Sequence, residues 1–213
     1  MMRSLHECAA EISSKLDRYL TGSRRSLIAI AGPPGAGKST LADVLVDILN
    51  ERLAGQPSEA VPMDGFHYDN HILDALALRA RKGAPETFDA SGFLAMLQRL
   101  KSSDAPVAIP VFDRSMDLSR ASARMIQPHH RLLVIEGNYL LLDRPIWREL
   151  RPLFDFTVML RPPLDIIETR LIQRWLDHGF AYEEACAKAR GNDLANAHVI
   201  LDESVAADLT FSE

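Results

Sequence analysis

The chain has 213 residues, 47% of them hydrophobic and 25% charged, with a formal net charge of -5. This composition predicts one folded domain over residues 1–213, and its acidity argues against nucleic acid as a partner. No apolar run approaches the roughly 18 residues that a membrane span needs, so we expect no membrane partner. The two cysteines, Cys8 and Cys186, have no metal-type spacing and fit a reducing cytoplasm.

The N-terminal segment predicts an amphipathic helix that packs on the rest of the domain. Apolar side chains recur at helical spacing at Leu5, Ile12, Leu16 and Tyr19. The same segment carries acidic residues and lacks the apolar centre of a signal peptide. We therefore expect residues 1–22 to form an N-terminal helix.

The next segment combines a strand, a glycine-rich loop and a helix. Leu27–Ala31 predicts a buried strand, and Thr40–Leu49 has the apolar stripe of a helix packed on a sheet. Between them, GPPGAGKS matches the P-loop template G-x-x-x-x-G-K-[ST]. Lys38 would bind the β- and γ-phosphates of a nucleoside triphosphate, and the Ser39 hydroxyl would coordinate Mg²⁺. The predicted nucleotide-binding residues are Gly32, Pro33, Pro34, Gly35, Ala36, Gly37, Lys38, Ser39 and Thr40.

A carboxylate follows the second predicted strand, Ala60–Met63. Asp64 would lie at the carboxyl end of a parallel strand near the P-loop, where a general base can accept a hydroxyl proton. His67, Tyr68 and Asn70 come next and are candidates for hydrogen bonds to the molecule that carries this hydroxyl. The segment therefore predicts a substrate site beside the phosphates.

Two alternatives stay open for this segment. Asp64-Gly65 is also an ordinary turn pair. His67 and His71 stand four residues apart and could ligate zinc from one face of a helix, although no cysteine or glutamate completes a familiar zinc motif. Hydrogen bonding to substrate is the interpretation that the neighbouring P-loop favours.

The rest of the chain alternates between helices and strands. Such alternation predicts an α/β fold with a mostly parallel sheet covered on both faces. The predicted elements are helices at His71–Arg81, Ser91–Leu100, Leu164–His178 and Tyr182–Ala189, strands at Leu132–Ile135, Phe154–Leu160 and Ala207–Phe211, and an antiparallel pair, Val107–Phe112 with Ala121–Ile126.

Three charged residues in the second half suit phosphoryl chemistry. Glu136 directly follows a buried strand, the position from which an acidic residue holds Mg²⁺ or its water. Arg170 and Arg174 lie one turn apart on a predicted helix and would close over the transferring phosphoryl group. They predict a lid over residues 162–190, the alternative being a solvated charged face.

Several stretches carry a resemblance to a known family. They are Gly32–Thr40 (GPPGAGKST), Pro62–Asn70 (PMDGFHYDN), Arg81–Asp89 (RKGAPETFD), Pro110–Arg114 (PVFDR), Ile135–Leu141 (IEGNYLL), Arg170–Arg174 and Asn192–Asn196. Together they resemble the phosphoribulokinase/uridine kinase superfamily, in particular its pantothenate-kinase-like bacterial members and the short proteins described as fructose-transport-system kinases or nucleoside kinase-like proteins.

The resemblance implies a P-loop NTPase of the nucleotide-kinase-like type, with three layers and a helical lid. It also implies transfer of the ATP γ-phosphoryl group to a hydroxyl, with Asp64 as the catalytic aspartate. Arg81 and Lys82 fall in a segment similar to one that lines the acceptor side in pantothenate kinases. The chain is shorter than those kinases, which separates it from them in the acceptor region.

The resulting hypothesis is an ATP- and Mg²⁺-dependent kinase with an alcohol group as acceptor. Asp64, Lys38, Arg170 and Arg174 would be catalytic. The expected acceptor is a sugar of the fructose-transport-associated type, with a nucleoside or pantothenate as alternatives. A P-loop NTPase switch without an acceptor is the rival class, although no Asn-Lys-x-Asp motif is present. We expect a cytoplasmic protein, and a homodimer stays open.

Overall fold

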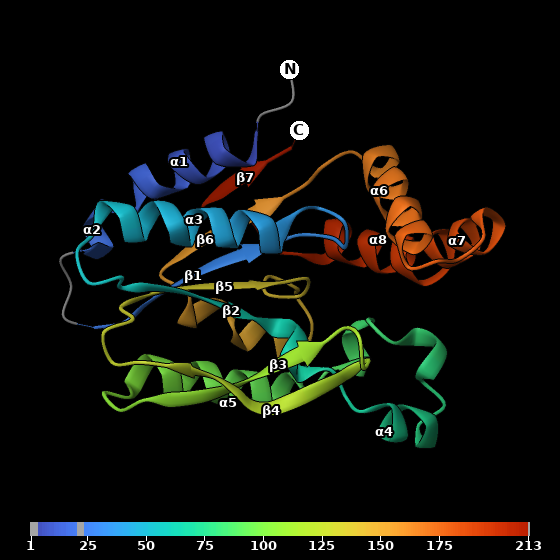
Figure 1. Cartoon of the computed structure of the whole chain (residues 1–213), viewed down its shortest axis with the longest axis horizontal. Coiled ribbons are helices and arrows are strands. Elements are labelled where there is room, and N and C mark those ends of the chain that lie inside the picture. The colour runs from blue at the N-terminus through green and yellow to red at the C-terminus, as the bar shows by residue number, and fades with distance from the viewer. Residues whose placement is uncertain (1–3, 21–23, 213) are drawn as a thin grey trace.

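The computed structural model describes residues 4–20 and 24–212, and five parallel strands form its central sheet (Figure 1). The strand order is β2-β5-β1-β6-β7. The strands are β1 (Ser26–Ala31), β2 (Ser58–Pro62), β5 (Leu132–Gly137), β6 (Phe156–Leu160) and β7 (Leu209–Phe211). The predicted α/β fold with a mostly parallel sheet is therefore confirmed.

The sheet register brings the ends of particular strands together. In β5 every side chain is buried, as expected of a strand covered on both faces. Glu136 near its carboxyl end is paired with Ile30 of β1 and with Pro62 of β2. The residues that follow β1 and β2, which include the P-loop and Asp64, consequently leave the sheet on either side of Glu136.

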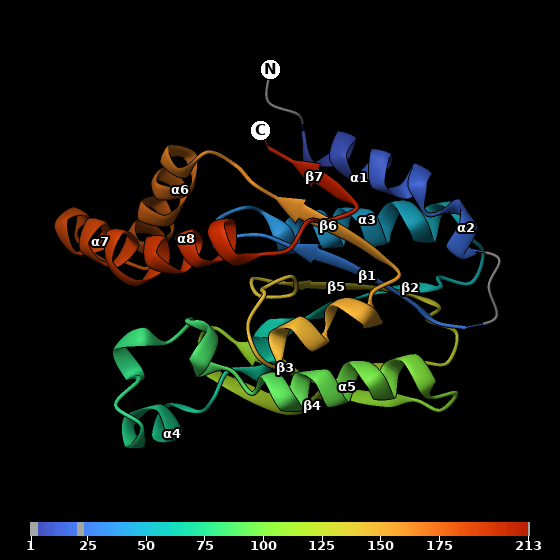
Figure 2. The ribbon, with the colours of Figure 1, turned by 180° about the vertical axis from the view of Figure 1, so that it is seen from behind.

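Two layers cover the faces of the sheet (Figures 1 and 2). One layer consists of α1 (Leu5–Lys15), α2 (Asp17–Leu20) and α3 (Lys38–Arg52), and it shares one apolar core with the sheet. The other layer contains α5 (Ala90–Ser102) and the antiparallel pair β3 (Val107–Asp113) and β4 (Leu118–Ile126), over a second core. The predicted three layers and the antiparallel pair are present.

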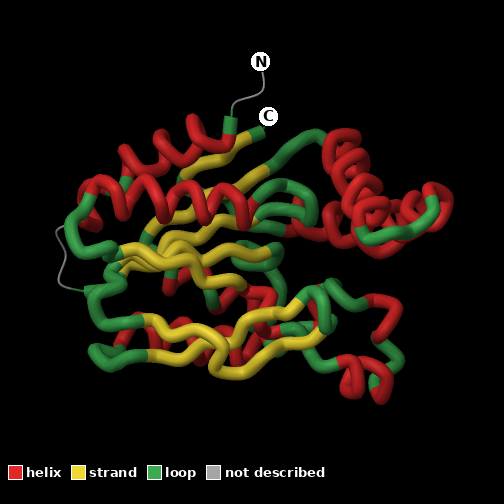
Figure 3. Tube along the Cα trace, in the orientation of Figure 1, coloured by secondary structure: helices red, strands yellow, loops and turns green. Residues whose placement is uncertain are grey.

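A helical region projects from one end of the sheet (Figure 3). It contains α6 (Leu164–Asp177), α7 (Tyr182–Lys188), a π-helical turn (Ala189–Asp193) and α8 (Leu194–Glu203), packed around a small apolar cluster of their own. It lies at the same end of the molecule as α4 (Asn70–Ala75) (Figures 1 and 2). None of the helices in the described ranges is long and apolar enough to cross a membrane.

The helix predicted over His71–Arg81 is wrong in its second half. α4 ends at Ala75 in a Schellman motif, in which the Leu78 N–H donates to the Leu73 carbonyl at 2.8 Å. Ala77 takes the left-handed conformation, with φ of +56°. Because glycine normally fills that position, the sequence did not show where the helix ends.

The predicted N-terminal helix is confirmed in the described residues but is divided in two. Ser4 and Glu7 form a capping box at the start of α1, and the chain turns at Leu16 before α2. Ile12 and Leu16 are fully buried. The remainder of the predicted helix, residues 1–3 and 21–22, lies outside the described part of the chain.

A buried arginine fastens the outer layer to the sheet and gives a prediction about stability. Arg25 precedes β1, is 6% exposed and donates to carbonyl groups at the end of α5 and in the loop before β5.

We expect Arg25→Met to lower the free energy of unfolding by about 2–4 kcal/mol, because buried carbonyls lose charged donors. Urea unfolding measures this change. Arg24→Met, at the exposed neighbouring position, should leave stability within about 0.5 kcal/mol, and equal effects at both positions would contradict the prediction.

Candidate active site

The P-loop joins β1 to α3 and leaves the first turn of the helix without a side-chain cap. Gly37 is the N-cap with φ of +88°, a left-handed conformation that suits glycine. A Cβ on Gly32 would lie 2.8 Å from the Leu160 carbonyl oxygen, so the loop also passes close to β6. The uncapped N–H groups at this positive helix end form a site for phosphate.

Lys38 and Glu136 are two buried, oppositely charged residues at the P-loop. They are 8% and 7% exposed, and Lys38 Nζ donates to the Pro33 carbonyl at 2.9 Å. Burial lowers the pKa of Lys38 to about 8, against the attraction of Glu136. Burial also raises the pKa of Glu136 to about 7, with Asp64 adding to the rise and Lys38 and a hydrogen bond from Ser39 opposing it.

The raised pKa of Glu136 predicts how the ligand-free protein responds to pH. The carboxyl titrates near 4.5 when unfolded and near 7 when folded, so the folded state binds the proton more tightly. Its contribution to stability is therefore largest below pH 4.5 and is lost as the pH rises through 7. Without nucleotide or Mg²⁺, we expect wild type to lose on the order of 1–3 kcal/mol relative to Glu136→Gln between about pH 5 and pH 7. Chemical unfolding of both proteins across this range measures the difference, and a difference independent of pH would contradict it.

Asp64 lies in the short 3-10 helix (Met63–Phe66) that follows β2, and its charge acts on both Lys38 and Glu136. Gly65 lets this helix pack against the hairpin, because a Cβ there would lie 2.6 Å from the Pro110 carbonyl oxygen. Arg114 Nη2, at the end of β3, lies 3.0 Å from Asp64 Oδ2. The structure therefore brings Asp64, Lys38 and Glu136 together, as their places after parallel strands predict.

His67 is held beside Asp64 by packing as well as by hydrogen bonding. Its Nδ1 lies 2.8 Å from the Asp64 carbonyl oxygen, and its ring lies 4.0 Å from that of Phe88 and 4.7 Å from that of Phe112, between centroids. Burial lowers its pKa, which favours the neutral imidazole. His71 lies exposed on α4, and no group of three or more His, Cys, Asp or Glu residues in the described chain is arranged to hold a metal.

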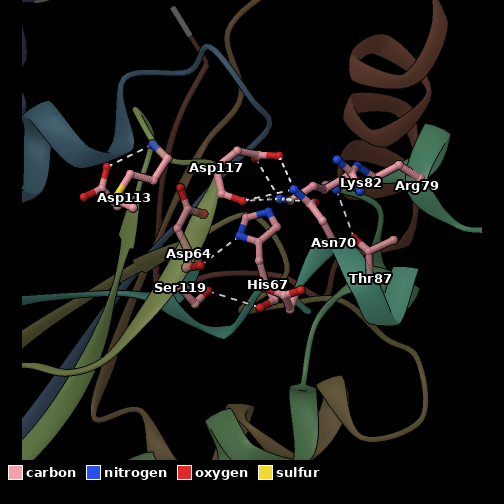
Figure 4. A network of polar contacts seen from close by, with 12 residues as sticks. Asp64, His67, Asn70, Arg79, Lys82, Thr87, Asp113, Asp117 and Ser119 are labelled. Atoms are coloured by element: carbon pink, nitrogen blue, oxygen red, sulfur yellow. Dashed lines mark hydrogen bonds and ion pairs between the residues drawn. The ribbon is translucent and has the colours of Figure 1, made fainter. Parts of the chain in front are cut away.

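Lys82 and Asn70 belong to a polar network at the tip of the hairpin (Figure 4). Lys82 Nζ donates to Asn70 Oδ1 and to Asp117 Oδ1, both at 2.7 Å, and Asn70 Nδ2 donates to Asp117 Oδ2 at 2.8 Å. These bonds join three segments: the start of α4, the loop after the 3-10 turn Arg79–Arg81, and the β3–β4 turn. In this ligand-free arrangement both residues have protein partners, and their roles as substrate-binding residues stay predictions.

The other two predicted substrate residues lie at the edge of this region. Tyr68 is half-buried, and its backbone N–H donates to the Thr87 carbonyl at 3.0 Å. Arg81 is exposed and pairs with Glu86 at 3.3 Å. Asp89, in the sequence Asp-x-x-Gly that an NTPase switch would use, accepts the Gly92 N–H as the N-cap of α5.

Arg170 and Arg174, the two arginines predicted to close over the phosphoryl group, lie on α6. Arg170 Nη1 donates to the Gly35 carbonyl at 3.2 Å, so this residue touches the P-loop directly. Arg174 Nη2 donates at 2.9 Å to Asp193 of the π-helical turn, which also accepts the Trp175 indole N–H at 2.7 Å. Arg174 is nevertheless close enough for its charge to lower the pKa of Lys38.

Four polar residues that shape this site were not among the predicted site residues. Arg114 and Asp117 come from the hairpin, and PVFDR was the signal that contained Arg114. Asp193 pairs with Arg174, and Asn192 Nδ2 donates to the Lys82 carbonyl at 2.8 Å, which links the π-helical turn to the loop after the 3-10 turn Arg79–Arg81. The resemblance pointed to Asn192–Asn196 without giving these contacts.

Comparisons with known proteins agree with this geometry. The sequence model of the phosphoribulokinase/uridine kinase family matches residues 27–204. The crystal structure of a "putative fructose transport system kinase" from Silicibacter sp. TM1040 is 44% identical, with a TM-score of 0.90 over 98% of this chain and 99% of that chain. "Putative uridine kinase C227.14" of Schizosaccharomyces pombe is 32% identical over 95% of this chain and 89% of its own.

A third relative is matched over a shorter range. Pantothenate kinase of Mycolicibacterium vanbaalenii is 32% identical over 150 residues, which are 70% of this chain and 48% of that protein. The P-loop, the parallel sheet, the predicted motifs and the family match all lead to the same assignment. The chain belongs to the phosphoribulokinase/uridine kinase family of P-loop kinases.

Proposed function

We propose that this kinase transfers the γ-phosphoryl group of ATP to a hydroxyl of a small sugar-like acceptor, with Mg²⁺ as cofactor. The observation that carries the proposal is the group of Lys38, Asp64 and Glu136 at the P-loop, in which Lys38 and Glu136 are buried and the charge of Asp64 acts on both of them. A buried cation for phosphate and two carboxylates, one for metal and one for a hydroxyl, are the parts that phosphoryl transfer requires.

The donor set at the P-loop fits Mg²⁺. Glu136 is a buried carboxylate whose charge is only partly compensated, and Ser39 hydrogen-bonds to it. Oxygen ligands and nucleotide phosphates are what Mg²⁺ prefers in such sites. Ser39 and Glu136 would hold the ion, which would neutralise charge on the β- and γ-phosphates when bound.

The protein's own residues supply the remaining functions. Lys38 and the backbone N–H groups of the P-loop position the triphosphate. Asp64 orients the acceptor hydroxyl and takes its proton, and Arg170 and Arg174 exclude water and place positive charge at the transferring group. Asp193 positions Arg174 for that role from the lid.

A sugar is favoured over a nucleoside by the surroundings of Phe112. This ring would be a platform for a nucleobase, but it is already in contact with His67 and with Lys82 Nζ, 5.1 Å from its centroid. The Silicibacter structure, similar over nearly the whole of both chains, also supports a sugar. The nucleoside remains the second candidate because of the uridine-kinase-named relative.

Release of ADP with MgATP and a panel of acceptors tests the proposal. The panel includes fructose and other sugars, their phosphates and acids, pantothenate and uridine. We expect one class of compound in the panel to stimulate turnover strongly, because the right acceptor completes the site. ADP release at one rate with every compound and with none would favour an NTPase switch instead.

A further inference from the structure

Arg114 lies at the entrance to the proposed catalytic base. It follows β3 at the start of the turn to β4, and its Nη2 lies 3.0 Å from Asp64 Oδ2. The Arg114 side chain is 63% exposed, whereas that of Asp64 is 27% exposed. The guanidinium is thus the more solvent-accessible member of the pair, and an acceptor that approaches Asp64 meets it.

The positive charge of Arg114 acts on the same centre as the P-loop residues. It contributes to lowering the pKa of Lys38 and opposes the rise in the pKa of Glu136. His67, the other titratable group in contact with Asp64, is held in its neutral form by burial. Among the residues that the structure describes, Arg114 is therefore the cation that forms an ion pair with the Asp64 carboxylate.

The other basic side chains on the acceptor side are paired with carboxylates that have no proposed catalytic role. Arg114 differs from them because its carboxylate is the proposed base. The pairs for comparison are Lys82 with Asp117 at 2.7 Å, Arg79 with Asp74 at 3.0 Å, Arg81 with Glu86 at 3.3 Å and Arg120 with Asp113 at 3.5 Å.

This pairing sets a condition on the acceptor. A hydroxyl that donates its proton to Asp64 competes with Arg114 for the Asp64 carboxylate. Once Arg114 is displaced from Asp64 and the site closes, its charge is removed from water and needs a new anionic partner. We infer that Arg114 binds an anionic group of the acceptor, a carboxylate or a phosphate, and covers Asp64 until such an acceptor arrives. The inference rests on the proposed function, in which Asp64 is the base.

The contact distance limits where the anionic group stands. Because Arg114 and Asp64 touch, the anionic group and the reacting hydroxyl must lie within a few bonds of each other, as in a small sugar acid or sugar phosphate. In the reaction the hydroxyl proton passes to Asp64, the hydroxyl oxygen bonds to the γ-phosphorus, and ADP leaves with the electrons of the broken P–O bond. Without an acceptor, the ion pair keeps Asp64 from activating water.

Matched acceptor pairs test which charge the site selects. We compare glycerol with glycerate, and fructose with fructose 6-phosphate, in wild type and in Arg114→Met. Arg120→Met is the control, since Arg120 is on the same hairpin and is 61% exposed.

In wild type we expect the anionic member of at least one pair to have a kcat/KM about 10- to 100-fold above that of its neutral partner. This preference for the anionic acceptor should be lost in Arg114→Met and kept in the control. The carboxylate and phosphate arms distinguish the two anions, and a preferred neutral member, or a preference that survives in Arg114→Met, would overturn the inference.

A second measurement does not depend on the choice of acceptors. Hydrolysis of MgATP without any acceptor should rise several-fold in Arg114→Met, because Asp64 is uncovered, and should stay at the wild-type rate in Arg120→Met. Adding Asp64→Asn to Arg114→Met should abolish the rise. No rise would overturn the covering role of Arg114. Failure of the proposed function has a different signature, in which Asp64→Asn leaves acceptor-dependent turnover intact.

Discussion

Replacing Asp64 with asparagine is expected to lower acceptor-dependent turnover at least about 100-fold while MgATP binds as before. Asparagine keeps the shape of the side chain and can still accept a hydrogen bond, but it cannot take the proton from the acceptor hydroxyl. The predicted nucleotide contacts come from the P-loop, and Asp64 is not among them. ADP release with the best acceptor and calorimetric titration of MgATP measure the two quantities separately.

Asp69→Asn provides a control five residues further on. Asp69 is exposed and caps α4 by accepting the His71 N–H at 2.8 Å, a role that asparagine also fills. This variant should keep wild-type turnover. Equal turnover in Asp64→Asn and wild type would remove Asp64 from the base role, whereas equal loss in both variants would indicate damage to the segment rather than to the chemistry.

The sheet could be predicted well because its strands are short apolar runs. Leu132–Ile135 was expected as a buried strand, and β5 extends it only as far as Gly137. α8 was not predicted, although Leu194, Ala197 and Ile200 have helical spacing. The preceding residues Gly191, Asn192 and Asp193 are of the types that favour turns. The structure continues helically through them as a π-helical turn, which local propensity does not reveal.

The site could be predicted only where it follows from the sheet. Asp64 follows β2, and Glu136 lies at the carboxyl end of the adjacent parallel strand β5, so their meeting at one edge follows from topology. Arg114 reaches Asp64 from a hairpin outside that sheet, and its approach depends on the close packing of Gly65 against Pro110. Such a contact comes from tertiary packing, which no spacing in the sequence specifies.

The charges at the P-loop favour binding over stability. The pKa of Lys38 is lowered and that of Glu136 is raised, so burial favours the neutral form of each residue. Keeping both residues charged in the empty site therefore costs free energy. Phosphate oxygens and a metal ion are the partners that would compensate each of them. Removing Lys38 should therefore affect activity far more than stability.

In Lys38→Met we expect kcat/KM for MgATP to fall at least about 100-fold, because the β- and γ-phosphates lose their cation. The melting temperature of the ligand-free protein should stay close to that of wild type, since methionine removes the cost of burying a charge together with the hydrogen bond to Pro33 and the attraction to Glu136. ADP release and thermal unfolding without nucleotide measure the two effects.

Lys101→Met should show the reverse behaviour. Lys101 Nζ donates to the Leu153 carbonyl at 2.6 Å and pairs with Asp155 at 3.1 Å. Neither partner belongs to the proposed active site. Its loss should lower stability by about 1 kcal/mol and leave turnover unchanged. If Lys38→Met instead retained turnover, the P-loop lysine would have no part in the reaction. If it unfolded at a much lower temperature, the attraction between Lys38 and Glu136 would outweigh the cost of burying them, and the charges of the empty site would support the fold.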